Sequence, residues 1–233
     1  MLGPLHGAAR MLRHVRGTDV PAAPVKCRDD LQEPVVALTF DDGPSEWTEP
    51  ILDLLRDAGA RATFFVIGEG IPEHANVLHR IRAEGHEVGN HTMSHPRLDS
   101  INRRAIAREI GEASEAIERV LGEPPAVFRP PGFHYNVPVL EVARAAGFDR
   151  VVLASATTDD YLRESAGEIA AAIVPRLAPG AIIGLHDGRP PREPPAHAGG
   201  TRADRRPTVA AVGLLLDRLP EYSFVTVSEL LAL

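Results

Sequence analysis

The 233-residue sequence has one cysteine, Cys27, and one lysine, Lys26. A single cysteine excludes an internal disulfide and any metal cluster built from several thiolates. Because lysine is nearly absent, arginine supplies almost all of the positive charge, and we attribute this to a GC-rich genome instead of to phosphate binding. A metal site in this chain would therefore use histidine and carboxylate ligands.

Long apolar runs and an excess of basic charge are also missing. No run approaches the roughly 20 residues needed to cross a bilayer, and the N-terminal residues lack the apolar segment of a secretory signal. We therefore expect a cytoplasmic protein without a transmembrane segment, or a secreted protein if a signal was removed. The formal net charge of -7, with acids and bases interspersed, argues against a nucleic-acid partner.

Short apolar runs alternate with amphipathic helical patterns along the chain. The predicted strands cover 35–38, 62–67, 87–89, 127–129, 151–153, 181–185 and 224–225, and the predicted helices cover 49–58, 72–84, 102–121, 137–146, 165–176 and 207–219. About seven repeats of strand and helix predict an α/β fold with a parallel sheet covered by helices, and so many units favour a closed or nearly closed barrel. We expect residues 1–30 to form an N-terminal arm that is either loosely ordered or contains a short helix near 8–16, and residues 31–233 to form one domain.

Asp41 and Asp42 lie where the first predicted strand ends at a Gly-Pro turn. Successive side chains of a strand point to opposite faces, so the two carboxylates are expected to do different jobs, one holding a metal and the other moving a proton. The alternative is a plain turn, because Asp, Gly and Pro all favour turns.

His91 and His95 are four residues apart. On one helical turn this spacing would place both imidazoles on one face, where they could hold a single ion. Position 92 is Thr, which excludes the metalloprotease motif that requires Glu there. Two histidines at this spacing also arise by chance, so the pattern needs support from the rest of the chain.

That support comes from the ends of the predicted strands. Barrel and open-sheet enzymes build their sites beyond the carboxyl ends of their strands. The residues found there are Asp41, Asp42, His91, His95, Arg129, His186 and Asp187. We therefore expect a two-histidine, one-carboxylate metal site of Asp42, His91 and His95, with positions left open for water and substrate.

The remaining strand-end residues suggest the parts of a hydrolytic site. Asp41 can take the proton of the attacking water, and His186 can protonate a leaving amine. Arg129 is placed to orient Asp41. The backbone N–H of Gly132 can serve the oxyanion, because this is the first residue after Arg129 that carries one.

These motifs resemble those of the polysaccharide deacetylases, the family-four carbohydrate esterases. Residues 39–44 (Thr-Phe-Asp-Asp-Gly-Pro) resemble the first motif of the family, 91–95 (His-Thr-Met-Ser-His) the second, 128–131 (Phe-Arg-Pro-Pro) the third and 186–187 (His-Asp) the fifth. The resemblance covers about residues 31–233. It implies a distorted (β/α) barrel and the hydrolysis of an N-acetyl, or occasionally O-acetyl, group on a sugar. It also implies Asp41 as the base, His186 as the acid and a divalent metal, with zinc preferred over cobalt, manganese or nickel.

Three positions depart from the family pattern. Gly132 replaces a Tyr, Gly184 replaces a Leu that lines the acetyl pocket, and Thr157 replaces an Asp that tunes the acid histidine. The first two losses would widen the pocket and change the sugar or acyl group, unless neighbouring side chains fill the space. Thr cannot supply the charge that raises a histidine's pKa. The carboxylates that could replace the missing one are Asp159, Asp160 and Asp187.

Other pocket residues and other functions stay open. The residues expected to line the pocket also include Phe133, Leu185, Asp160 and Trp47, the last as a sugar-stacking or a packing residue. The loop 188–207 is predicted to be a lid or binding loop, or an insertion without a role. The alternative functions are a cyclic imide or ureide hydrolase on the same scaffold and a catalytically degenerate carbohydrate-binding protein. The retained Asp41, Arg129 and His186 favour an enzyme.

Overall fold

The computed structural model describes residues 22–163, 165–190 and 204–233. The strands are β1 (Ala23–Val25), β2 (Val35–Asp41), β3 (Thr63–Val66), β4 (Glu87–Asn90), β5 (Arg150–Val152), β6 (Ala156–Thr157), β7 (Ile182–His186) and β8 (Ser223–Val225). One sheet has the order β4-β3-β2-β7-β6, with β8 also paired to β2, and a second sheet joins β1 to β5. Every one of these strand pairs is parallel.

The backbone at Phe128 joins the two sheets. It bridges Asn90 at the end of β4 and Val151 in β5. At the opposite edge, the backbone N–H of Ser155, just after β5, donates to the carbonyl of Ile182 in β7 at 3.0 Å. The strands therefore curve almost into a closed ring, which confirms the predicted distorted barrel of parallel strands. The strand expected at 127–129 is reduced to this single bridging residue.

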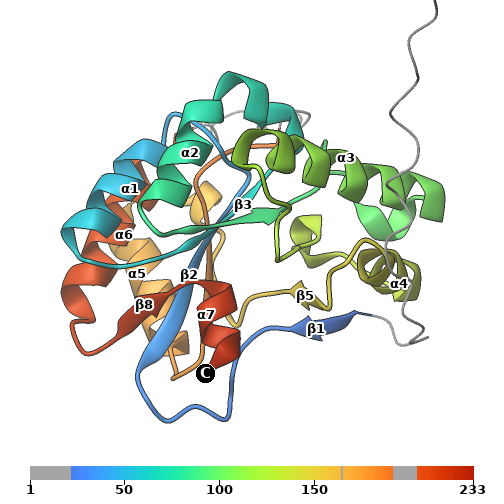
Figure 1. Ribbon diagram of the computed structural model, residues 1–233. Helices are drawn as coiled ribbons and strands as arrows, with labels where there is room; N and C mark the ends of the chain where they lie inside the picture. The colour runs from blue at the N-terminus through green and yellow to red at the C-terminus, as the bar shows by residue number, and fades with distance from the viewer. Residues whose placement is uncertain (1–21, 164, 191–203) are drawn as a thin grey trace, which may run out of the picture.

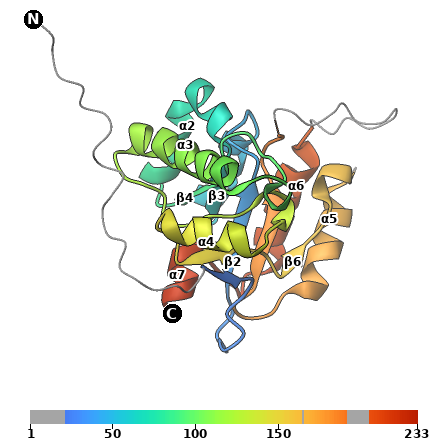
Figure 2. The same ribbon diagram turned by 90° about the vertical axis from the view of Figure 1, so that its right-hand side faces the viewer.

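Helices cover the outside of the barrel (Figure 1). The α-helices are α1 (Thr48–Asp57), α2 (Ala75–Ala83), α3 (Arg103–Leu121), α4 (Val137–Ala145), α5 (Ala166–Ile173), α6 (Arg206–Arg218) and α7 (Val227–Ala232). The short 3-10 helices are η1 (Gly68–Glu73), η2 (Leu98–Ser100), η3 (Pro131–Phe133), η4 (Asp160–Leu162) and η5 (Val174–Arg176). Figure 2 shows α5 and α6 on one side of β2 and α2 and α3 on the other, with α4 in front of the strand. Among the described residues, no helix is long and apolar enough to cross a membrane.

Apolar side chains pack in three clusters. The largest lies between the strands and α1, α2, α5 and α6, and a second joins α3 and α4 to Phe128. The third fills the inside of the barrel, where Ala37, Phe65 and Ile182 meet Val227 and Leu230 of α7. Burying each such large apolar side chain stabilises the fold by roughly 1.5–3 kcal/mol.

The two ends of the chain differ from the sequence-based expectation. β1 lies within the predicted N-terminal arm and pairs with β5, so the packed structure begins before residue 31. The expected helix near 8–16 and most of the loop 188–207 fall outside the described residues. At the C-terminus, α7 lies where no helix was predicted. It begins with a capping box between Thr226 and Glu229, a local signal that the sequence does contain.

Candidate metal and catalytic site

Asp41 and Asp42 reach the same cavity although they are adjacent on one strand. Asp41 is the last residue of β2, and Asp42 follows it with a φ of 72°. This left-handed turn interrupts the alternation of a strand, so both carboxylates line one cavity of about 170 Å³. Gly188 permits the turn, because a Cβ on it would lie 2.0 Å from the carbonyl oxygen of Asp42. The expectation of opposite faces therefore fails at Asp42.

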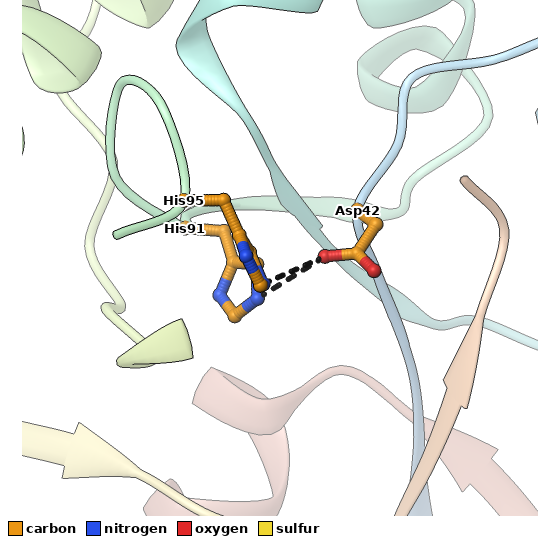
Figure 3. Close-up of side chains that lie close together, drawn as sticks. All are labelled: Asp42, His91 and His95. Atoms are coloured by element: carbon orange, nitrogen blue, oxygen red, sulfur yellow. Dashed lines mark ion pairs between the residues drawn. The ribbon is translucent and has the colours of Figure 1, made fainter. Parts of the chain in front are cut away.

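Asp42, His91 and His95 form a compact group of possible metal ligands (Figure 3). Their ligand atoms all lie within 4.8 Å of one another. The Oδ1 atom of Asp42 is 3.5 Å from Nε2 of His91 and 3.2 Å from Nε2 of His95. Burial by itself raises the pKa of Asp42, but the hydrogen bond from His95 and the charges of His186, His95 and His91 outweigh it and hold that pKa well below its usual range.

The two histidines lie on a loop, not on the helical turn that their spacing suggested. Thr92 and His95 both have positive φ angles, of 72° and 58°. Side chains hold this loop: Asn90 Oδ1 accepts from the N–H of Thr92 at 2.7 Å, and Glu109 accepts from the N–H of Ser94 at 2.8 Å. The predicted pair of imidazoles is present, but its geometry depends on contacts from β4 and α3.

The orientation of His91 suits a metal ligand. Its Nδ1 is 2.8 Å from the carbonyl oxygen of Arg129. A carbonyl only accepts, so Nδ1 carries the hydrogen and Nε2 presents its lone pair toward Asp42. Burial lowers the pKa of His91 to about 4, despite the opposing charges of Asp41 and Asp42. The ring is therefore neutral near pH 7, as a ligand must be.

Arg129 is fully buried against Asp41. Its Nη1 donates to Asp41 Oδ1 and to Thr39 Oγ1, each at 2.7 Å, and its guanidinium lies 4.1 Å from the centre of the Phe65 ring. Its Nη2 donates to the carbonyl of Leu153 at 2.9 Å. These contacts fix the guanidinium and the Oδ1 atom of Asp41, which also lines the cavity.

His186 is held on the opposite wall by Asp160. Its Nδ1 is 2.7 Å from Asp160 Oδ1, and its side chain keeps 23% exposure toward the cavity. Burial by itself lowers the pKa of His186, but the charge and hydrogen bond of Asp160 outweigh it and raise that pKa to about 9. The ring of Tyr161 stands edge-on to the imidazole, with centroids 5.1 Å apart. Asp160 is thus the carboxylate that compensates for Thr157.

The predicted pocket residues divide into two groups. Gly132 and Phe133 line the cavity together with the catalytic candidates. Leu185 is instead buried in the large apolar cluster on the other face of β7, which corrects its expected place in the pocket. Trp47 belongs to a separate surface cavity of about 480 Å³ between α1 and α6, so the structure does not bring it to the metal ligands.

Gly184 does not open the pocket. A Cβ on it would lie 3.2 Å from Ala154 Cβ, 3.3 Å from Thr157 Cγ2 and 3.9 Å from the tip of the Phe133 ring. Neighbouring side chains therefore fill the space that a larger residue would occupy. Of the two possibilities, a wider pocket or a filled space, the contacts at Gly184 favour the filled space. Thr157 pairs with Gly184 in the register of β6 and β7 and contributes to this filling.

The cavity also contains residues that sequence reasoning did not assign to the site. Arg205 lines it together with Pro190 and Tyr161, and Arg205 is only 2% exposed. Arg205 and Pro190 lie in the loop 188–207, for which a lid or binding role was one of the two predictions, but no single residue of that loop was assigned to the site.

Sequence and structure comparisons agree on the family. Residues 28–151 match the family model of the polysaccharide deacetylases. The chain is 37% identical over 204 residues to a peptidoglycan-N-acetylglucosamine deacetylase of Bacillus cereus, covering 85% of this chain and 89% of that protein. It is 38% identical over 200 residues to a chitooligosaccharide deacetylase of Sinorhizobium fredii, covering 85% and 91%.

Two solved structures are similar to the whole barrel. The peptidoglycan deacetylase PdaC of Bacillus subtilis has a TM-score of 0.73 at 29% identity, covering 86% of this chain and 91% of that one. A family 4 carbohydrate esterase of Streptomyces lividans, in complex with acetate, has a TM-score of 0.69 at 27% identity, covering 82% and 91%. The fold and the matches define a carbohydrate deacetylase, as predicted. The chain belongs to the polysaccharide deacetylase family.

Proposed function

We propose that this protein is a metal-dependent hydrolase that removes an N-acyl group, with N-acetyl preferred, from an amino sugar within a glycan. The observation that carries the proposal is one cavity that holds the Asp42, His91 and His95 cluster between Asp41 and His186. Relatives named for deacetylation of peptidoglycan N-acetylglucosamine and of chitooligosaccharides support N-acetylglucosamine as the substrate unit.

The ligand group fits a divalent cation. Asp42 Oδ1 is buried and faces Nε2 of His91 at 3.5 Å and Nε2 of His95 at 3.2 Å, so three possible ligand atoms converge on one point. Two imidazoles and one carboxylate favour zinc, with cobalt, manganese and nickel as alternatives. A bound divalent ion would polarise the acyl carbonyl and lower the pKa of water.

The protein's own residues supply the proton transfers. Asp41, held by Arg129, takes a proton from the attacking water as the new C–O bond forms. The N–H of Gly132 faces the carbonyl oxygen as charge develops on it. His186, protonated at neutral pH because its pKa is about 9, gives its proton to the sugar nitrogen as the C–N bond breaks. The products are a carboxylate such as acetate and a free amino sugar.

The test compares metal content and amine release from N-acetylglucosamine oligomers for the wild type, Asp41→Asn, His91→Ala and His79→Ala. His79 lies exposed on α2, so its variant is the matched control and should keep both metal and activity. We expect Asp41→Asn to bind metal with a rate about 10²–10⁴-fold lower, because it removes a general base. His91→Ala should lose both metal and activity.

Other results would identify the alternatives. A wild type that binds metal and releases no amine, but opens cyclic imides, would be an imide hydrolase. A wild type that binds no metal would be a degenerate carbohydrate-binding protein, and the proposal would be withdrawn.

A further inference from the structure

The start of α6 contacts the general-acid side of the cavity with two buried side chains. Thr208 is 1% exposed and Arg205 is 2% exposed. Neither residue was predicted to belong to the site, and the proton transfers above do not involve them. Their hydrogen bonds lead to Asp160 and to the turn after β7.

Thr208 fixes the rotation of the Asp160 carboxylate. Its Oγ1 donates to Asp160 Oδ2 at 2.8 Å, and the same oxygen accepts the backbone N–H of His186 at 3.1 Å. The other oxygen, Oδ1, faces Nδ1 of His186 at 2.7 Å. With both oxygens engaged, the carboxylate cannot turn away from the imidazole without losing a buried hydrogen bond.

Arg205 holds the chain that follows His186. Its Nε donates to the carbonyl oxygen of Gly188 at 2.9 Å. Gly188 lies directly against the backbone of Asp42, as the close approach of any added Cβ shows. The start of α6 therefore supports the acid histidine through Asp160 and the metal-ligand turn through Gly188.

We propose that Thr208 is a positioning residue for the general acid, holding Asp160 in the orientation that keeps His186 aimed at the leaving nitrogen. This inference rests on the proposed role of His186. The hydroxyl acts through Asp160 and does not reach the reacting atoms.

The effect of losing the Thr208 hydroxyl on the pKa of His186 depends on the charged and titratable groups around that imidazole. Asp160 and Tyr161 face it from η4, Asp41 and Asp42 from the end of β2, and Arg205 lines the same cavity. Replacing Thr208 by Val changes none of these charges. A change in the titration of His186 would then report the geometry of Asp160.

The experiment uses the zinc-loaded full chain and compares Thr208→Val, Thr208→Ser and Thr63→Val. Thr63 is the matched control, because it is also fully buried and donates to a carboxylate, Glu87 Oε2, at 2.7 Å, but at the amino end of β3. The measurements are kcat and KM against pH with N-acetylglucosamine oligomers, and the NMR titration of the His186 ring.

We expect Thr208→Val to move the alkaline limb of kcat and the NMR pKa of His186 to lower pH by about one unit, with kcat near pH 9 reduced about fivefold and KM unchanged. Thr208→Ser keeps a hydroxyl and should restore the wild-type profile. Thr63→Val should lower stability without moving the alkaline limb of kcat or the NMR pKa of His186.

An active Thr208→Val enzyme with the wild-type alkaline limb and His186 pKa would overturn the inference. If the Val variant does not fold, Thr208→Ala gives the same comparison. A wild type without metal or amine release would instead reject the proposed function. The NMR titration would still test the link from Thr208 to His186 in that case.

Discussion

Asp42 shows how a single residue can leave the pattern of its strand and so enter the site. Its φ of 72° is a conformation that Asp adopts more readily than most residues with a Cβ. The turn places its carboxylate in the cavity that Asp41 also lines, with His91 and His95 opposite. The alternation of strand side chains predicted opposite faces and separate roles for the two acids. It could not predict that they share one cavity, because the turn depends on contact with Gly188.

At the same scale, Gly184→Leu is expected to destabilise the protein without changing its acyl preference. The new side chain would meet Ala154 and Thr157 within 3.3 Å of its Cβ, and overpacking a core costs about 1–3 kcal/mol. Denaturant unfolding measures the stability, and rates on acetyl and longer acyl substrates measure the preference.

Gly213→Ala is the control for the Gly184 substitution, because the nearest atom to its added Cβ is 3.8 Å away, an ordinary contact. A Gly184→Leu protein of wild-type stability, with a reduced rate on longer acyl groups, would mean that this residue does open onto the pocket.

Elements with local signals were predicted closely, and elements held by distant contacts were not. The helix expected at 102–121 is α3, with Asn102 as its N-cap and Gly122 as its left-handed C-cap, all of which follow from neighbouring residues. The His91 to His95 segment was assigned a helical turn because its actual shape depends on Asn90 and Glu109. The pairing of His186 with Asp160 likewise joins β7 to η4, and sequence could offer it only as one of three choices.

Within α3, Gly111→Ala is expected to raise the free energy of unfolding by about 0.8–1 kcal/mol. No atom lies within 4 Å of the added Cβ, and glycine in a helix interior is less favourable than alanine by that amount. Urea unfolding at constant pH measures the change.

The matched substitution in this helix is Gly122→Ala, which should lower stability by about 1–2 kcal/mol, because Gly122 has a φ of 79° and a Cβ is unfavourable there. Equal effects of the two substitutions would show that the cap geometry does not matter.

In the whole molecule, the two ends of the barrel differ: one carries the site residues and the other is covered by α7. The carboxyl ends of β2, β4 and β7 carry Asp41, His91 and His186 toward one cavity, as barrel enzymes do. α7 lies at the amino ends, where the backbone N–H of Val227 donates to Thr63 Oγ1 at the start of β3 (Figure 1). Leu230 of α7 belongs to the apolar cluster that also contains Phe65 and Ile182. The sequence predicted the catalytic end from residues that follow strands. It did not predict α7, because a six-residue helix has too short an apolar pattern to be recognised from sequence.

This division predicts that Leu230→Ala lowers the free energy of unfolding by about 2–5 kcal/mol while kcat per folded molecule stays unchanged. Leu230 is fully buried and does not line the cavity that holds Asp41 and His186, so its truncation leaves a separate cavity in the core. Leu233→Ala is the control, because Leu233 is 62% exposed and should change stability by less than about 0.5 kcal/mol. Chemical unfolding and amine release, measured on the same preparations, test both statements. If kcat per folded molecule fell in Leu230→Ala, α7 would influence the site. The two ends of the barrel would then have to be treated as one cooperative unit.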